Sequence, residues 1–280
     1  MGMRHVMLSD RVFRCGLSTL LVLWALSVAG HGQAAPIAVR FPEGATHGYL
    51  TVRDESGSRL ADGELIQRMR GHLVEARLLF RFKDGSVHDE RVTFTQHRVF
   101  MLQTYTLEQS GPSFPSPVSL SLDRKSGAYR VQSLDAEPAT ILSGRLDLPS
   151  DVCNGMVLTL LRNLPPGGEE TVHVVAFTPD PKIVPLRLAP GNTSTVRIGD
   201  LAKEVTQYIL EPKLARLTAL FGKLLGKLPA EFHYRVWLLT DDVPAFAGFE
   251  GPLYVHGPTW RIEQSMPSFW TAPGGLASAN

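Results

Sequence analysis

Short alternations of apolar and polar residues run through most of the chain, and they predict β-strands. The clearest lies at Val74–Phe82, where the even positions are apolar and the odd positions largely charged. Such a strand buries one face and turns the other toward water. Asp84-Gly85 follows as a two-residue turn, and a partner strand through Val92 and Phe94 completes a predicted hairpin.

The same alternation, punctuated by Gly, Pro, Asp and Ser, continues at roughly ten-residue intervals. Further strands are predicted at 99–107, 118–122, 129–131, 173–178, 183–188, 195–198, 205–209, 232–239 and 260–263. Residues 111–117 contain three prolines, which remove backbone donors, so this segment is predicted to be a loop. Strands that follow one another without intervening helices favour a mainly β fold. We expect one curved antiparallel sheet, a half-barrel or open barrel of about 11–12 strands.

Two helices are predicted to cover the concave face of this sheet. The first runs from Asp151, which caps it, to Leu164, where two prolines follow. The second spans 212–228 and carries one apolar stripe of leucines and Phe221, with a small, cationic polar side. Two interpretations of this stripe stay open. Either it closes the curled sheet, or it is a mobile lid or a transient membrane-surface contact, in which its Lys and Arg side chains attract anionic head groups.

The N-terminal segment has the order of a secretory signal peptide. Arg4, Arg11 and Arg14 precede an apolar run at 17–29, and small residues follow it. The run is about 13 residues long, whereas a membrane span needs roughly 20. We expect export to the periplasm or the exterior, with cleavage near Gly30 or Ala34. The predicted parts are a signal peptide (1–34), a single β-rich domain (35–264) and a disordered tail (265–280) rich in small residues.

Charge and composition narrow the class of protein. The chain has 28 Lys and Arg against 27 Asp and Glu, a net charge of +1. This balance excludes the basic excess with which nucleic-acid-binding proteins neutralise phosphates. After cleavage one cysteine, Cys153, remains, so no internal disulfide forms. We expect Cys153 to be a small buried residue rather than a reactive thiol.

No motif for catalysis or metal binding appears in the chain. The histidines show no recognised metal-ligand spacing, and His88-Asp89-Glu90 is predicted to lie on an exposed hairpin strand. Asp241-Asp242 follows a strand, where turn-forming carboxylates are ordinary. We therefore predict a non-enzymatic protein without a metal or cofactor. A hydrolase would instead require a histidine and a carboxylate that converge on a serine or on Cys153.

One segment of the chain resembles an uncharacterised family of exported bacterial proteins, a domain of unknown function. Leu146–Met156, followed by Leu161-Arg162, resembles a segment in which Leu-Pro and a nearby Asp open a helix between two groups of strands. Tyr234–Leu238 and Phe249–Leu253 are similar to that family's closing strands. The resemblance spans residues 40–264. At residues 153–155 the sequence Cys-Asn-Gly departs from the Asp-x-x-Ser pattern with which the family's helix begins.

That family is similar to the lipoprotein-carrier half-barrels, curved antiparallel sheets of about eleven strands whose concave face is closed by helices and holds an acyl chain. The resemblance implies the same architecture as the alternation does. It also implies a hydrophobic ligand, by analogy with those carriers.

These observations lead to a hypothesis of function: an exported envelope protein that binds a lipid or acyl chain between its curved sheet and its helices. The predicted ligand-binding walls are Met156, Leu160, Leu217, Leu220, Phe221, Leu224, Phe232, Tyr234 and Val236. Lys223 and Lys227 are predicted to meet an anionic head group. The alternative is an envelope scaffold or assembly factor whose barrel is filled by its own side chains. Room for an acyl chain inside the barrel distinguishes the two hypotheses.

Overall fold

The computed structural model describes residues 36–135, 138, 140–177, 180–198, 201–213 and 234–265. The chain divides into two compact units, Met1–Gln33 and Ala34–Asn280, and the described residues all lie in the second. The predicted signal peptide, most of the predicted helix at 212–228 and the predicted tail beyond residue 265 lie outside the described residues.

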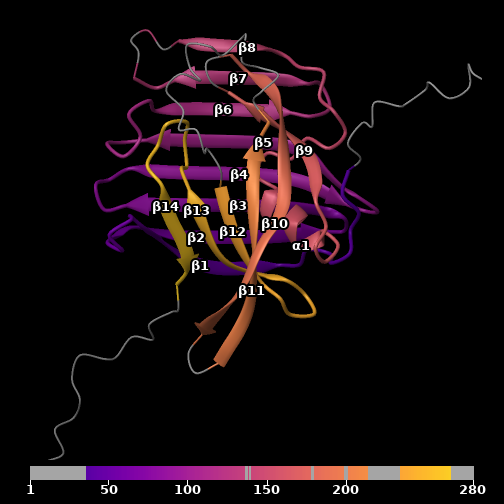
Figure 1. Cartoon of the computed structure of the whole chain (residues 1–280). Helices are drawn as coiled ribbons and strands as arrows, with labels where there is room; N and C mark the ends of the chain where they lie inside the picture. The colour runs from indigo at the N-terminus through magenta and orange to yellow at the C-terminus, as the bar shows by residue number, and fades with distance from the viewer. Residues whose placement is uncertain are drawn as a thin grey trace, which may run out of the picture. The chain divides into compact units, whose positions relative to one another are not determined.

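The described residues form one sheet of fourteen strands in which all neighbours are antiparallel (Figure 1). In chain order the strands are β1 (Thr46–Arg53), β2 (Arg59–Arg70), β3 (Leu73–Phe82), β4 (Val87–Gln96), β5 (Phe100–Ser110), β6 (Val118–Asp123), β7 (Ala128–Ser133), β8 (Ile141–Arg145), β9 (Glu170–Ala176), β10 (Lys182–Ile198), β11 (Leu201–Pro212), β12 (Tyr234–Leu239), β13 (Ala245–Gly251) and β14 (Trp260–Gln264). One helix, α1 (Val157–Asn163), connects β8 to β9.

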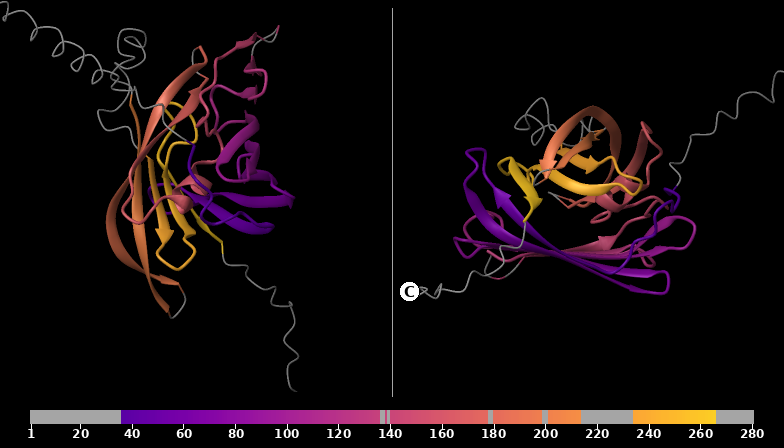
Figure 2. Two further views of the ribbon diagram at one scale, coloured as in Figure 1. Left: turned by 90° about the vertical axis from the view of Figure 1, so that its right-hand side faces the viewer. Right: turned by 90° about the horizontal axis from the view of Figure 1, so that it is seen from below.

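The sheet curls so that its two halves face each other. β1 pairs with β14 in the middle, and the strand order runs outward from there to β8 on one side and β9 on the other. Figure 2 shows β1–β8 as one curved wall and β9–β14 as the opposite wall. The prediction of a curved antiparallel sheet is therefore confirmed. Its strand count was too low. Alternation did not predict β1, β2, β8 or β13, whereas the two strands predicted at 183–188 and 195–198 are parts of one strand, β10.

The inner face of the sheet holds two separate hydrophobic cores. The first, here called the helix core, lies around α1 and includes Val92, Tyr105 and Leu160. The second, here called the aromatic core, includes Phe80, Phe114 and Trp260. The buried ring of Phe80 crosses β2 at Gly63, where an added Cβ would lie 2.4 Å from two ring atoms. Only glycine allows this close approach.

The helices differ from the sequence prediction. The first was expected at 151–164, but α1 occupies Val157–Asn163, and Met156 precedes it without a side-chain cap. Asp151 does not cap it, because the Asp151 carboxylate pairs with His173 instead. The second helix was expected to begin at Pro212, which is wrong because Pro212 ends β11. The described residues thus show one helix rather than two covering helices, and none in the described ranges is long and apolar enough to cross a bilayer.

The segment between β8 and α1 bridges the two edges of the sheet. It begins beside β7, where the Leu146 amide donates to Gly127. It then reaches β9, where the Cys153 amide donates to the His173 carbonyl. The side chain of Asn154 continues this pairing. Its Nδ2 donates to the Val175 carbonyl at 2.9 Å, and the Val175 amide donates to Oδ1 at 2.8 Å. Asn154 therefore occupies the exposed edge of β9 as a neighbouring strand would.

We expect the substitution Asn154→Asp to lower the free energy of unfolding by about 1–3 kcal/mol, because it replaces the donor to the buried Val175 carbonyl with a second acceptor. Asn154→Leu, which leaves both Val175 groups unpaired, should lower it further. Urea unfolding measures both effects. Asn192→Leu, an exposed position on β10, is the control. Equal stabilities of the Asn154 and Asn192 variants would contradict the assigned role.

Candidate ligand-binding interior

One row of side chains crosses the inner face between the two cores. Strand register places its members side by side on seven consecutive strands. They are Leu65, Leu78, Glu90, Leu107, Leu120, Val131 and Leu142, from β2 to β8, and they are here called the inner row. Six of the seven are apolar, and the single exception is the carboxylic acid Glu90.

Six members of the inner row keep part of their surface exposed, whereas Leu120 is buried. The parallel rows on either side are mostly buried. Phe80, His88 and Gln109 form the row toward the aromatic core. Val92 and Tyr105 belong to the row toward the helix core. Leu65 and Leu78 pack against the aromatic core, Leu107 and Val131 pack against the helix core, and Leu120 belongs to the helix core. The inner row thus joins the two cores, and its side chains are almost all aliphatic and only partly buried.

The opposite wall contributes aromatic rings to the same region. Phe246 and Phe249 of β13 are partly buried and pack against both cores. Tyr234 of β12 lies beside Phe249, with their ring centroids 6.0 Å apart. Burial raises the pKa of Tyr234 to about 12, so its hydroxyl stays neutral under ordinary conditions. An apolar interior with a few polar groups is the usual character of a small-molecule site.

The sequence-predicted wall residues fall into two sets. Met156, Leu160 and Val236 are buried in the helix core, and Tyr234 packs against it partly buried. Contact between these four and a ligand stays a prediction. The others lie outside the described residues: Leu217, Leu220, Phe221, Lys223, Leu224, Lys227 and Phe232. The inner row itself was not predicted, because cross-strand register depends on hairpin lengths that alternation alone does not fix.

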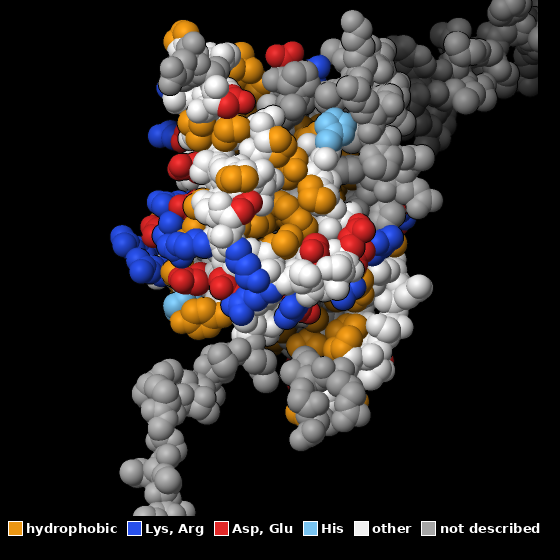
Figure 3. All heavy atoms as spheres, turned by 90° about the vertical axis from the view of Figure 1, so that its left-hand side faces the viewer, with side chains coloured by type: hydrophobic (Ala, Val, Ile, Leu, Met, Phe, Trp, Pro, Cys, Tyr) orange, Lys and Arg blue, Asp and Glu red, His pale blue; other side chains and the backbone are white. Residues whose placement is uncertain are grey.

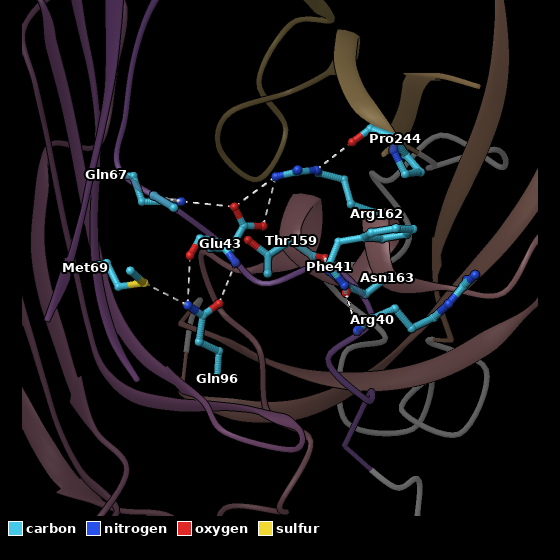
Figure 4. A network of polar contacts seen from close by, with 11 residues as sticks. Arg40, Phe41, Glu43, Gln67, Met69, Gln96, Thr159, Arg162, Asn163 and Pro244 are labelled. Atoms are coloured by element: carbon cyan, nitrogen blue, oxygen red, sulfur yellow. Dashed lines mark hydrogen bonds and ion pairs between the residues drawn. The ribbon is translucent and has the colours of Figure 1, made fainter. Parts of the chain in front are cut away.

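A buried polar network fixes α1 inside the sheet (Figure 4). Arg162 of α1 donates to both carboxylate oxygens of Glu43, at 3.0 and 2.9 Å, and to the Pro244 carbonyl at 2.7 Å. Glu43 also accepts from Gln67 of β2 and pairs through its backbone with Gln96 of β4. One charged pair thus connects the N-terminal segment, the helix and both walls. Removing one partner of such a pair typically costs roughly 3–5 kcal/mol.

Asn163 adds a second anchor at the end of the same helix. Its side-chain oxygen accepts from the backbone amides of Arg40 and Phe41, at 2.8 and 2.7 Å. Its side-chain nitrogen donates to the Thr159 carbonyl within the helix. The N-terminal segment is therefore fixed to α1 by side-chain amide hydrogen bonds as well as by the ion pair.

The outer face of the β1–β8 wall is charged. Arg77 and Arg91 both hold Asp89 through paired hydrogen bonds. Burial opposes ionisation of Asp89, but these two guanidinium groups outweigh it and hold its pKa well below the usual range. Figure 3 shows Lys, Arg, Asp and Glu side chains gathered toward the left of the view and apolar side chains in its centre. Polar and apolar positions are thus divided between the outer and inner faces.

The prediction that His88-Asp89-Glu90 lies on an exposed strand is wrong for His88, which is 4% exposed. Its ring lies between those of Phe80 and Phe114. Gln109 Nε2 donates to His88 Nδ1 and also to the Leu253 carbonyl, so the hydrogen-bond network places the imidazole proton on Nε2. Among the described residues no acceptor meets this Nε2. Burial lowers the pKa of His88 to about 4, so the ring is neutral.

The structure brings together Asp151 and His173 next to Cys153. Asp151 accepts from His173 Nδ1 at 2.8 Å, and the Cys153 amide donates to the His173 carbonyl. Burial, with a smaller contribution from Asp151, raises the pKa of the Cys153 thiol well above its ordinary value. No hydrogen bond joins the imidazole to the thiol in the described part of the chain. A protonated, buried thiol is a poor nucleophile, so this cluster does not assemble the hydrolase centre that the sequence left open.

No group of three or more His, Cys, Asp or Glu side chains within the described ranges has the geometry of a metal site. The fold is that of a mainly β protein whose single curved sheet remains open. The sequence matches no protein-family model and no curated protein sequence. A structure search finds a crystal structure of a beta-barrel-like protein of domain of unknown function DUF1849 from Brucella abortus. It has a TM-score of 0.42 and 10% sequence identity, over 80% of this chain and 98% of that chain.

We expect the pH dependence of stability to report the buried state of His88. Because its pKa is lowered from 6.5 to about 4 in the folded chain, the unfolded chain takes up a proton first as the pH falls. The contribution of His88 to the free energy of unfolding is complete above pH 6.5. It declines as the pH falls toward 4, by about 3 kcal/mol in total.

Urea unfolding of His88→Gln across this range tests the expectation. The variant should lose that part of the pH dependence, whereas His256→Gln, at an exposed loop position, should keep it. Parallel pH profiles for the wild type and His88→Gln would contradict the assignment.

Proposed function

We propose that this chain is an exported, non-enzymatic envelope protein whose interior binds a hydrophobic ligand, a lipid or acyl chain. The observation that carries the proposal is the inner row, whose side chains are aliphatic except for Glu90 and partly exposed except for Leu120. A filled barrel would bury these side chains as fully as it buries the neighbouring rows. Aliphatic surface left open inside a sheet gains free energy when an apolar ligand covers it.

The dimensions of the inner row suit an extended aliphatic chain. Its seven side chains stand on neighbouring strands, which lie about 4.8 Å apart. The row therefore extends about 29 Å along the curved sheet. Phe246 and Phe249 on the facing wall supply apolar cover for the same region. A ligand held in this way would be shielded from water over most of its length.

Two parts of the proposal rest on the sequence pattern. The basic, apolar and small-residue order of the first 35 residues supports export. The cationic helix predicted at 212–228 supports a membrane-surface contact, with Lys223 and Lys227 near an anionic head group.

Native mass spectrometry of the full chain, purified from the envelope of its own cells, tests the proposal. We expect a copurifying lipid mass on the wild-type protein. Leu107→Trp places a large side chain into the inner row and should reduce the bound fraction at least about tenfold. Thr106→Trp, at the neighbouring exposed position on the outer face of β5, should retain the lipid.

Circular dichroism and thermal melting confirm that both variants are folded. A wild-type protein that carries no lipid, and whose melting temperature is unchanged by added lipids, would contradict the proposal and favour the scaffold hypothesis. Equal lipid loss in both variants would contradict the assignment of the ligand to the inner row.

A further inference from the structure

Glu90 is the one polar member of the inner row, and it lies near the middle. In the strand register it stands opposite Leu78 on one side and Leu107 on the other. Its carboxylate accepts one hydrogen bond, from the Tyr105 hydroxyl to Oε1 at 2.8 Å. Tyr105 is itself buried, and its ring stacks on Phe177 of the segment after β9. The position of Glu90 is therefore fixed from the helix-core side.

The surroundings of Glu90 contain no described cation that pairs with it. The neighbouring charges on β4, Asp89 and Arg91, belong to the outer face, where Asp89 pairs with both Arg77 and Arg91. Burial raises the pKa of Glu90, and the hydrogen bond from Tyr105 only partly opposes this effect. A carboxylic acid in an aliphatic row without a cation reduces stability. Such a group is a candidate for ligand binding rather than for structure.

Tyr105 and Glu90 together define the chemistry that fits. The tyrosine hydroxyl already donates to Oε1, so the second carboxylate oxygen, on the partly exposed side chain, remains available as an acceptor. A carboxylate surrounded by leucines attracts a cation strongly, because the local dielectric constant is low. A carboxylate or phosphate gains no such attraction, and because burial already raises the pKa of Glu90, ionisation beside an anion is disfavoured further. The site therefore differs from the anionic head-group site predicted at Lys223 and Lys227.

We infer that Glu90 binds the protonated amine of an aliphatic ligand whose hydrocarbon lies along the inner row. The inference rests on the proposed function and adds the class of head group to it. The ammonium group would pair with the Glu90 carboxylate, with Tyr105 holding the other oxygen in place. Leu78 and Leu107 would contact the first carbons of the chain on either side.

Isothermal titration calorimetry with three dodecyl compounds tests this inference. Delipidated full-length protein is titrated with dodecylamine, 1-dodecanol and dodecanoate at neutral pH, each below its aggregation limit. We expect the wild type to bind the amine at least about tenfold more tightly than the alcohol, and dodecanoate most weakly. Glu90→Gln, which removes the charge and keeps an acceptor for Tyr105, should bind the amine and the alcohol equally.

Two further variants control the experiment. Glu108→Gln removes a carboxylate from the outer face of the next strand and should retain the preference for the amine. Glu90→Leu completes the aliphatic row and should bind all three compounds without a preference, so it replaces Glu90→Gln if that variant does not fold.

The outcomes separate the two proposals. Equal binding of the amine and the alcohol to the wild type overturns this inference and leaves the proposed function intact. A preference for the amine that persists in Glu90→Gln and Glu90→Leu also overturns it. If no dodecyl compound binds and no lipid copurifies with the protein, the proposed function fails as well.

Discussion

The apolar inner face of this sheet has to be shielded from water. In the described part of the chain no hydrogen-bonded ladder joins its edge strands, β8 and β9, so the sheet does not close on itself. An open sheet with an apolar face is stable in water only if other elements hold the curve and cover the face. Here the Glu43–Arg162 pair fixes α1 between the walls, and Asn154 pairs with the edge of β9. These polar contacts determine how closely the two walls approach each other.

The spacing of the walls decides what the interior can do. At one end the gap is filled by α1, and at the other by the rings of Phe82, Phe114 and Trp260. Between these ends the inner-row side chains stay partly exposed, except for Leu120, while Phe246 and Phe249 of the facing wall pack against both cores. The spacing that α1 and the aromatic rings set between the walls thus leaves this aliphatic section partly exposed.

Much of the architecture could be predicted from the sequence, because a two-residue period directly identifies strands and their buried face. The two strands of the hairpin from Val74 through Phe94 were predicted correctly, but its two-residue turn was not. The Phe82 amide donates to the Ser86 carbonyl, so the loop between them has three residues, 83–85. The extent of α1 was not, because Asp151 is a good helix cap in isolation and only the folded chain brings His173 to it. The burial of His88 was missed for a related reason. The alternation gives the face on which His88 lies, whereas its burial depends on Phe114, which is distant in sequence.

The central claim is that the middle of the barrel is an unfilled apolar site. A crystal structure of the delipidated full chain under xenon pressure tests this claim most directly. Xenon enters apolar cavities that the side chains of the protein do not fill. The account predicts xenon density beside Leu78, Leu107 and Phe249, between the two cores. Side chains that interdigitate across this region, with no xenon bound between the walls, would contradict it.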